Sequence, residues 1–574
     1  MSLRYEECLQ KDYICSGPSI GTAFSDMQYF IKQFEKSIKT RWNQAALDEF
    51  RTSSLTYGEL AAKVVENHLF FEAVGLDRGD KVSINARSSA QWAEIFMSVV
   101  SGGYVAVQLF NGYTPSDTQS LVHHSDSRIL YTEKQIFSNM DFEAMPQVMG
   151  VIDLKSGELL ASRGNFAEIY ASKSGLFASK YPAGLTPDDV NFIDRDMDEL
   201  CAINYTSGST GNPKGVMLSV RNFSANVELI PTIYPYIPGE SYVSVLPYAH
   251  IFGLTYDMIT PLCLGLTLCV LYVPPVPANL KPALQHYKPS VFFAVPLILT
   301  KLIENTIGEF IHSKSGQEKL ADHENNPDFC RALRIILMES LGGNIKVFVT
   351  GGAAIPAHFE ELIATKLQCP FVTGYGMTEC APTITLGRIG HYKLKSCGVP
   401  VTPWVDLKIL SPDPKVIPGE VVVKGDVVFE GYYKAAETTK SVMTEDGWFK
   451  TGDIGIIDDD NVVFLMGRSK NMLLSTNGQN VFPEEIEVVL NALPYVQESL
   501  IVERDGHFIA IVVPNQDLAA TDNLSAEALK NIMECNIKAL NEKIPAYSQV
   551  SGFELRFEPF AKTPKGSIKR FMYN

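Results

Sequence analysis

The 574-residue sequence lacks several features that would place it in particular protein classes. Its ten cysteines include no CxxC pair, so the usual spacing of zinc ligands is absent. No apolar run reaches the about 20 residues that a membrane-spanning helix needs. The most apolar stretch, 261–273, is bounded by prolines and predicts a buried strand or helix. The N-terminus has no basic region followed by an apolar one, so we expect no signal peptide and a reducing, cytoplasmic location.

Positive charge is also scarce. The 49 lysines and arginines are outnumbered by 65 acidic residues, which gives a net charge of −16. Nucleic-acid binding needs clustered Lys and Arg, so we expect small-molecule partners and no nucleic acid. With 46% hydrophobic and 20% charged residues, the composition is typical of a globular protein.

Strands alternate with helical patterns over most of the chain, which indicates an α/β fold. Residues 55–74 predict an amphipathic helix with Thr56 near its start, and residues 81–84 predict a strand. Beyond residue 466 the pattern changes to a helix, a hairpin, a long helix and a short strand. We therefore predict a large N-terminal domain of mixed sheets with flanking helices, residues 1–467. A small mobile α+β C-terminal domain, residues 468–574, follows it.

The segment Tyr205–Gly215 concentrates hydroxyls, glycines and one lysine directly after an apolar strand. Glycines let backbone N–H groups turn toward an anion, hydroxyls donate to phosphate oxygens, and Lys214 adds a charge. The spacing differs from that of a Walker-type P-loop. Taken alone, the segment predicts either a phosphate-binding loop or a Ser/Gly-rich surface turn. The candidate binding residues are Thr206, Ser207, Gly208, Ser209, Thr210 and Gly211.

This segment closely resembles the phosphate-binding motif of the adenylate-forming superfamily, which includes acyl-CoA synthetases, adenylation domains and luciferases. Further blocks resemble the superfamily in the same order along the chain. They are Leu246–Gly253, Gly351–Pro356, Thr373–Glu379, Trp448–Asp453 and Gly467–Lys470. The resemblance runs from about residue 55 to residue 570.

The resemblance implies a role for each candidate residue. His250 would lie by the carboxylate and the thioester, and Glu379, with Thr206, would hold Mg²⁺ through hard oxygen ligands. Asp453 and Arg468 would bind the ribose, and Lys470 would be the hinge between the domains. The adenine would contact Gly352, Ala353, Thr373, Gly374, Tyr375, Gly376, Met377 and Thr378. Read singly, these residues fit ordinary roles, such as a core histidine, a turn acid or a surface arginine.

The implied activity is ligation of a carboxylic acid to coenzyme A, driven by ATP through an acyl-adenylate. Two features favour medium- to long-chain fatty acids. The segment Ser88–Trp92 resembles a motif of long-chain members, and the stretch between Pro296 and Ile345 carries extra helical sequence. The alternatives are a fatty-acyl-AMP ligase that loads a carrier protein and a non-catalytic acyl-ligand sensor. Peripheral membrane contact and a homodimer are left open.

The C-terminus departs from the family pattern. Most acyl-CoA synthetases carry a lysine there that bridges the carboxylate and the α-phosphate. Alignment on Thr563-Pro564 and Arg570 places Ser567 at that position. Either adenylation is impaired, or a neighbouring lysine, Lys565 or Lys569, replaces the missing charge. We favour Lys569 as the catalytic residue, because long-chain members often show Lys-Ile-Lys-Arg here.

Overall fold

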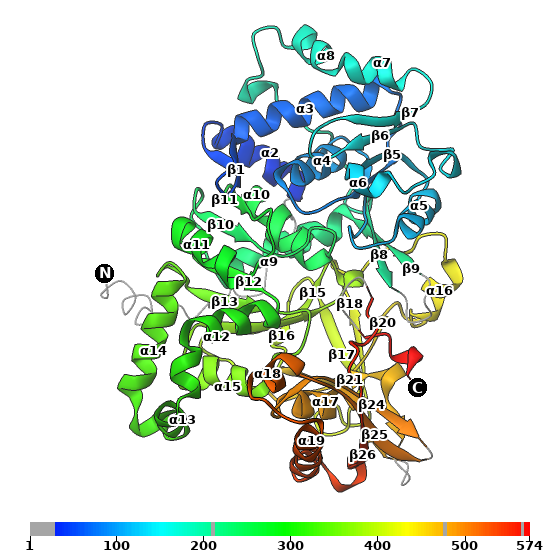
Figure 1. The fold of residues 1–574 in the computed structure, drawn as a ribbon. Coiled ribbons are helices and arrows are strands. Elements are labelled where there is room, and N and C mark those ends of the chain that lie inside the picture. The colour runs from blue at the N-terminus through cyan, green and yellow to red at the C-terminus, as the bar shows by residue number, and fades with distance from the viewer. Residues whose placement is uncertain (1–28, 208–212, 475–478, 505, 564–567, 574) are drawn as a thin grey trace.

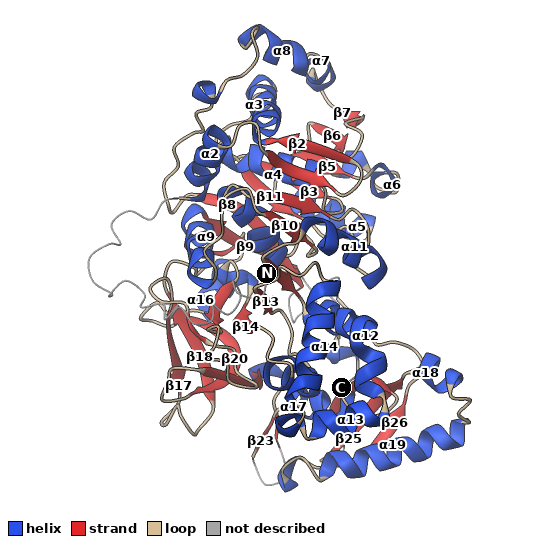
Figure 2. Ribbon diagram, turned by 90° about the vertical axis from the view of Figure 1, so that its left-hand side faces the viewer, coloured by secondary structure: helices blue, strands red, loops and turns tan. Residues whose placement is uncertain are grey.

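The computed structural model describes residues 29–207, 213–474, 479–504, 506–563 and 568–573 (Figure 1). These residues form a mixed α/β fold, in which helices flank several sheets (Figure 2). The predicted fold class is therefore confirmed. The boundary at 467/468 and the mobility of the C-terminal domain stay predictions.

The largest sheet of the described chain has the strand order β19-β9-β8-β4-β3-β5-β6-β7. Strands β8, β4, β3, β5 and β6 run parallel, while β9 is antiparallel to β8. The candidate phosphate loop thus follows the carboxyl end of a parallel strand, where α/β sheets commonly bind ligands. The strands are β3 (Lys81–Asn85), β4 (Val105–Gln108), β5 (Ser127–Thr132), β6 (Gly150–Asp153), β7 (Leu159–Ser162), β8 (Leu200–Ser207), β9 (Pro213–Ser219) and β19 (Gly431–Tyr432).

Three smaller sheets complete the N-terminal part of the described chain. Their orders are β10-β11-β1-β2, β12-β13-β14-β15-β16 and β17-β18-β20-β21. The strands are β1 (Ala45–Glu49), β2 (Ser53–Thr56), β10 (Ser241–Ser244), β11 (Thr267–Val270), β12 (Val291–Ala294), β13 (Val347–Thr350), β14 (Phe371–Gly376), β15 (Thr383–Leu386), β16 (Val399–Pro400), β17 (Asp406–Leu410), β18 (Gly419–Lys424), β20 (Phe449–Ile457) and β21 (Val463–Arg468).

Several helices of this part begin at a local capping signal, namely α3, α4, α5 and α13. Helix α3 starts at Tyr57 because Thr56 and Glu59 form a capping box, in which each side chain accepts from the other residue's N–H. The stretch 261–273 contains a helix and a strand, α10 and β11, with Gly265 at φ +71° between them. The helices are α2 (Phe30–Thr40), α3 (Tyr57–Ala73), α4 (Ala90–Ser101), α5 (Pro115–His124), α6 (Lys134–Phe137), α7 (Phe166–Ala171), α8 (Lys173–Lys180), α9 (Val220–Ile233), α10 (Thr260–Cys263), α11 (Pro277–Tyr287), α12 (Pro296–His312), α13 (Lys314–Ala321), α14 (Pro327–Ser340), α15 (Ala357–Glu361) and α16 (Ala436–Ser441).

The C-terminal unit has its own three-stranded sheet, β24-β25-β26, with a hydrophobic core between the sheet and two helices. The predicted helix, hairpin, long helix and final strand all occur, although Asp505 of the hairpin turn lies outside the described residues. The elements are β22 (Leu473–Leu474), β23 (Asn480–Val481), α17 (Pro483–Asn491), β24 (Val496–Arg504), β25 (His507–Pro514), α18 (Gln516–Thr521), α19 (Ala526–Asn541) and β26 (Val550–Leu555).

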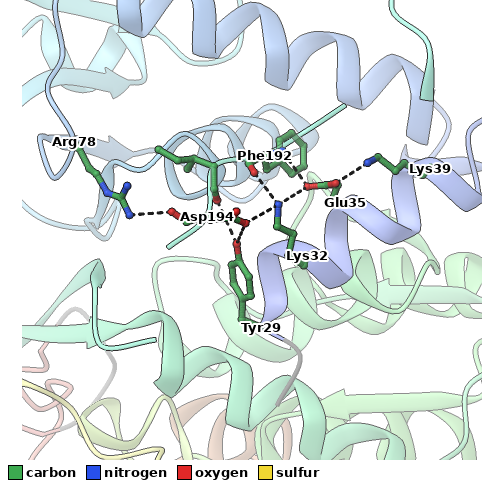
Figure 3. A network of polar contacts seen from close by, with 8 residues as sticks. Tyr29, Lys32, Glu35, Lys39, Arg78, Phe192 and Asp194 are labelled. Carbon is green, nitrogen blue, oxygen red and sulfur yellow. Dashed lines mark hydrogen bonds and ion pairs between the residues drawn. The ribbon is translucent and has the colours of Figure 1, made fainter. Parts of the chain in front are cut away.

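A polar network joins helix α2 to the segment that leads into β8 (Figure 3). Lys32 Nζ lies 3.0 Å from Asp194 Oδ1, and the Phe192 N–H donates to Glu35 Oε2 at 3.0 Å. Arg78 Nη2 donates to the Asp194 carbonyl oxygen at 3.0 Å. Together these bonds hold the chain just before the strand that carries Thr206.

The predicted helical extension between Pro296 and Ile345 is confirmed as α12, α13 and α14. Figures 1 and 2 place these helices at the same end of the molecule as the C-terminal unit. Among the described residues, none of the helices combines the length and the apolarity that crossing a bilayer requires.

Candidate active site

The β8–β9 hairpin carries the candidate phosphate-binding residues. Thr206 pairs with Lys214 across the hairpin, and Ser207 ends β8. The candidates Gly208, Ser209, Thr210 and Gly211 lie outside the described residues. The structure therefore places the two ends of the loop but leaves the phosphate-binding role of its centre a prediction.

Lys214 belongs to a cluster that also contains Glu379. Its Nζ lies 5.0 Å from the centroid of the Tyr432 ring, and the Tyr432 hydroxyl donates to Glu379 Oε1 at 2.8 Å. Glu379 is buried in the 3₁₀ turn Thr378–Cys380, and its carbonyl accepts from the Phe429 N–H at 2.9 Å. One tyrosine thus links the candidate phosphate-binding lysine to the candidate metal ligand.

A second cluster joins Tyr375, Asp453 and Arg468. The Tyr375 hydroxyl donates to Asp453 Oδ2 at 2.6 Å, and Arg468 Nε lies 2.9 Å from Asp453 Oδ1. Asp453 and Arg468 face each other in the β20–β21 ladder. Burial raises the pKa of Asp453, which the charge of Arg468 and the Tyr375 hydroxyl both lower. Burial also raises the pKa of Tyr375 well above its usual value.

The two clusters are neighbours. The charge of Arg468 lowers the pKa of Tyr432, although burial raises it overall. The charge of Asp453 is the largest cause of a raised pKa of Arg468, and Tyr375 and Glu379 add to the effect. Lys214, Glu379, Tyr375, Asp453 and Arg468 therefore belong to one connected charged region.

Two glycines of these blocks lie close to neighbouring backbone. A Cβ on Gly376 would lie 1.9 Å from the Pro382 carbonyl oxygen, and one on Gly351 would lie 3.0 Å from the Gly374 carbonyl oxygen. The loop with Gly352, at φ +82°, and Ala353 therefore lies against strand β14. The remaining members of the block are Thr373, whose hydroxyl donates to the Ser396 carbonyl, and Met377 and Thr378, at the start of the 3₁₀ turn.

His250 lies in the turn between β10 and a buried helical segment. Its Nδ1 accepts from the Phe252 N–H at 3.2 Å, and its ring makes an edge contact with Phe110, with 6.3 Å between centroids. The segment is also held from the N-terminal side, because the Tyr248 N–H donates to Ser88 Oγ at 2.9 Å. The motif that favours long acyl chains thus contacts the His250 segment.

Lys470 and Lys569 lie on the C-terminal side of the site. Lys470 is in the short 3₁₀ turn Ser469–Asn471, directly after Arg468. Lys569 precedes Arg570, which forms ion pairs with Glu484 and Glu487 of α17. Glu484 also accepts from Asn471 Nδ2 at 2.5 Å. This chain of contacts connects the C-terminal segment to the turn that follows Arg468.

Sequence reasoning did not find Tyr432. The residue lies outside all six sequence blocks, and its position between Lys214 and Glu379 results from the pairing of β19 with β9. A short Tyr-Tyr sequence carries no local signal for such a contact.

The donor set fits Mg²⁺ as implied by the family. A buried carboxylate, Glu379, and a hydroxyl, Thr206, are hard oxygen ligands, and Mg²⁺ usually combines one or two carboxylates with substrate phosphates. The described residues contain no cluster of three or more His, Cys, Asp or Glu side chains suited to a metal ion. A metal at this site would depend on phosphate oxygens for most of its coordination.

Comparison with known families agrees with this geometry. The family model described as AMP-binding enzyme matches residues 34–433, and the model of the AMP-binding enzyme C-terminal domain matches residues 470–573. The chain therefore belongs to the AMP-binding enzyme family, part of the adenylate-forming superfamily.

Named relatives are distant but extensive. The long-chain-fatty-acid–CoA ligase FadD15 of Mycobacterium bovis is 26% identical over 489 residues, which cover 80% of this chain and 77% of the relative. A long-chain-fatty-acid–[acyl-carrier-protein] ligase of Arabidopsis thaliana, AEE15, is also 26% identical, over 560 residues that cover 83% of this chain and 75% of the relative. The anthranilate CoA ligase AuaEII, solved with anthranoyl-AMP, shares the fold with a TM-score of 0.76 at 20% identity, covering 95% of this chain and 96% of its own.

Proposed function

We propose that this enzyme activates medium- to long-chain fatty acids with ATP and transfers the acyl group to coenzyme A. The observation that carries the proposal is the connected region of Lys214, Tyr432, Glu379, Asp453 and Arg468 in a chain of this family. It offers cationic, carboxylate and hydroxyl groups at the end of a loop suited to phosphate.

In the first step, a carboxylate oxygen attacks the α-phosphorus of ATP, and pyrophosphate leaves as the acyl-adenylate forms. Lys214 neutralises phosphate charge, while Asp453 accepts from the ribose hydroxyls and Arg468 holds Asp453 in place. Glu379 and Thr206 would hold Mg²⁺, which would supply positive charge to screen the phosphates. Tyr432 keeps the Glu379 carboxylate oriented.

In the second step, the thiol sulfur of coenzyme A attacks the acyl carbon, the thiol proton is lost and AMP leaves. His250 lies on the segment that we assign to the acyl carbon. A rotation of the C-terminal domain about Lys470 would replace the groups of the first step, since a few dihedrals can absorb such a motion.

The acyl preference is supported by the Ser88 contact to the His250 segment and by helices α12–α14. The names of the M. bovis and other relatives point the same way. The relative that loads a carrier protein makes this acceptor the second candidate. The eight described cysteines are free thiols, which fits a cytoplasmic location.

The test is AMP release with coenzyme A across acids from acetate to oleate, with benzoates included. We expect release that requires both coenzyme A and an acid of medium or long chain. Release with holo carrier protein but not with coenzyme A would select the second candidate. Absence of ATP–pyrophosphate exchange with every acid would identify a non-catalytic sensor and reject the proposal.

A further inference from the structure

Three residues after His250 the chain begins a π-helical segment, Gly253–Ile259, in which every residue is buried. Such segments are rare and often lie at functional sites. The segment packs directly on the backbone before His250, because a Cβ on Gly253 would lie 2.3 Å from the Pro247 carbonyl oxygen. One of its polar side chains, Asp257, bonds to the segment that leads to His250, and two, Thr255 and Tyr256, bond on the side of the segment that follows Glu379.

Asp257 holds the segment that leads to His250. Its Oδ2 accepts from the Val245 and Leu246 N–H groups, each at 2.7 Å, and its Oδ1 accepts from the Tyr242 hydroxyl at 2.8 Å. The residue has no exposed surface. A buried carboxylate without donors would be costly, so these three bonds fix both the carboxylate and the backbone it contacts.

Thr255 and Tyr256 hold the segment that follows Glu379. The Thr255 hydroxyl donates to the Ala381 carbonyl at 2.9 Å, and the Tyr256 hydroxyl donates to Asn226 Oδ1 at 2.8 Å. The same Asn226 oxygen accepts from the Thr383 N–H at 3.1 Å, and Asn226 Nδ2 donates to the Cys380 carbonyl at 3.2 Å. The π-helical segment is thus bonded to the backbone that leads to His250 and to the backbone that follows Glu379.

We propose that Asp257 is a positioning residue, which sets His250 relative to Glu379 by tying the His250 segment to the π-helical turn. This inference rests on the proposed function, since it assigns His250 and Glu379 to one reaction. Asp257 does not touch the reacting atoms in this scheme. It acts through the backbone of residues 245 and 246, so its effect requires His250 to be present.

The experiment compares wild type, Asp257→Asn, His250→Ala and the double variant in the full ligase reaction. Asparagine has nearly the same shape as aspartate, but its NH₂ group is a donor. It would face either the Tyr242 hydroxyl or the two backbone N–H groups, which would then lose their acceptor. Misplacement of a catalytic group by about 1 Å costs about 10²-fold, so we expect Asp257→Asn to lower kcat by about ten- to a hundredfold with KM for ATP nearly unchanged. In the His250→Ala background the same change should alter kcat less than about twofold, because coupled residues are not additive.

Asp153→Asn is the matched control. Asp153 is also buried and also accepts from two backbone N–H groups and one hydroxyl, from Lys134 and Ser156, but on β6, away from the site. We expect this variant to keep kcat. Tyr242→Phe is the milder variant, because it removes one donor to Asp257 and leaves the two backbone bonds. It should lower kcat by a smaller factor, again only when His250 is present.

Three results would overturn the inference. They are wild-type kcat in a folded Asp257→Asn protein, an equal loss in both His250 backgrounds, and an equal loss in Asp153→Asn. Should Asp257→Asn not fold, Tyr242→Phe decides alone, and an unchanged kcat there rejects the positioning role. Failure of the proposed function is distinguishable, since wild type itself would then show no acid-dependent turnover.

Discussion

Replacement of Tyr375 by Phe tests how the buried Asp453 carboxylate is stabilised. The change removes one hydroxyl and leaves Asp453 with Arg468 and the other bonds of the strand. A hydrogen bond to a charged group contributes about 1.5–3 kcal/mol, against about 0.5–1.5 kcal/mol for a neutral one. Asp453 is only 5% exposed, so water cannot replace the lost donor and we expect the higher range.

The loss should depend on pH. Burial raises the pKa of Asp453 above 3.8, and the Tyr375 bond opposes that shift. The bond favours the ionised form, so its contribution is present above the folded pKa and is lost as the pH falls through it. The free energy of unfolding should therefore fall by about 1.5–3 kcal/mol at about pH 8, and by progressively less as the pH is lowered through the folded pKa of Asp453.

The assay is urea unfolding followed by tryptophan fluorescence, since Trp42, Trp92, Trp404 and Trp448 all precede the C-terminal unit. Tyr57→Phe is the control, because its buried hydroxyl donates to the Leu266 carbonyl at 2.8 Å, a neutral acceptor. Its loss should be smaller and independent of pH. A loss in Tyr375→Phe that stays constant while the pH is lowered to the onset of acid unfolding would refute the argument that Asp453 is the ionised partner.

Three further predictions concern the proposed reaction. Lys214→Ala should slow ATP–pyrophosphate exchange by about 10²–10³-fold, as for loss of a preorganised group facing developing charge; an unchanged exchange rate would remove this lysine from the mechanism. Lys470→Pro should keep exchange but lose thioester formation, because Pro fixes φ and removes a donor; equal damage to both half-reactions would indicate misfolding instead. Each buried methylene contributes about 0.8 kcal/mol, about fourfold, so dodecanoate should exceed butanoate by orders of magnitude in kcat/KM, and a flat profile would reject the long-chain assignment.

Elements set by local chemistry could be predicted from the sequence. The start of α3 follows from the Thr56 capping box. Helix α17, the first helix of the C-terminal unit, follows from Pro483 and an apolar stripe. The stretch 261–273 could not be assigned as strand or helix, because its apolar residues suit either one. The structure contains both, separated at Gly265.

For the candidate site, too, the sequence predicts single residues but not the contacts between them. Motifs predict Lys214, Glu379, Asp453 and Arg468 as site residues, because each belongs to a short segment with a characteristic spacing. The bonds that connect them come from distant segments, and Tyr432 reaches Glu379 only through the pairing of β19 with β9. Asp257 was missed because a single acid in an apolar run gives no sign that it caps a backbone turn in the fold.

The catalytic lysine of the C-terminal segment is the last prediction. Ser567 and Lys565 lie outside the described residues, so the structure describes only Lys569 of the two candidate lysines. Its N–H donates to the Ala561 carbonyl at 2.8 Å, and the next residue, Arg570, is paired with Glu484 and Glu487.

Lys569 is thus next in sequence to the residue that pairs with Glu484, and Glu484 also accepts from Asn471, three residues after Arg468. A lysine stem is long and flexible, so it can supply the charge that Ser567 cannot. We expect Lys569→Ala to slow ATP–pyrophosphate exchange strongly and Lys565→Ala to leave it nearly unchanged. The reverse order would name Lys565 instead. If the double variant exchanges pyrophosphate as fast as wild type, neither lysine bridges the carboxylate and the α-phosphate, and adenylation proceeds without a charge from this segment.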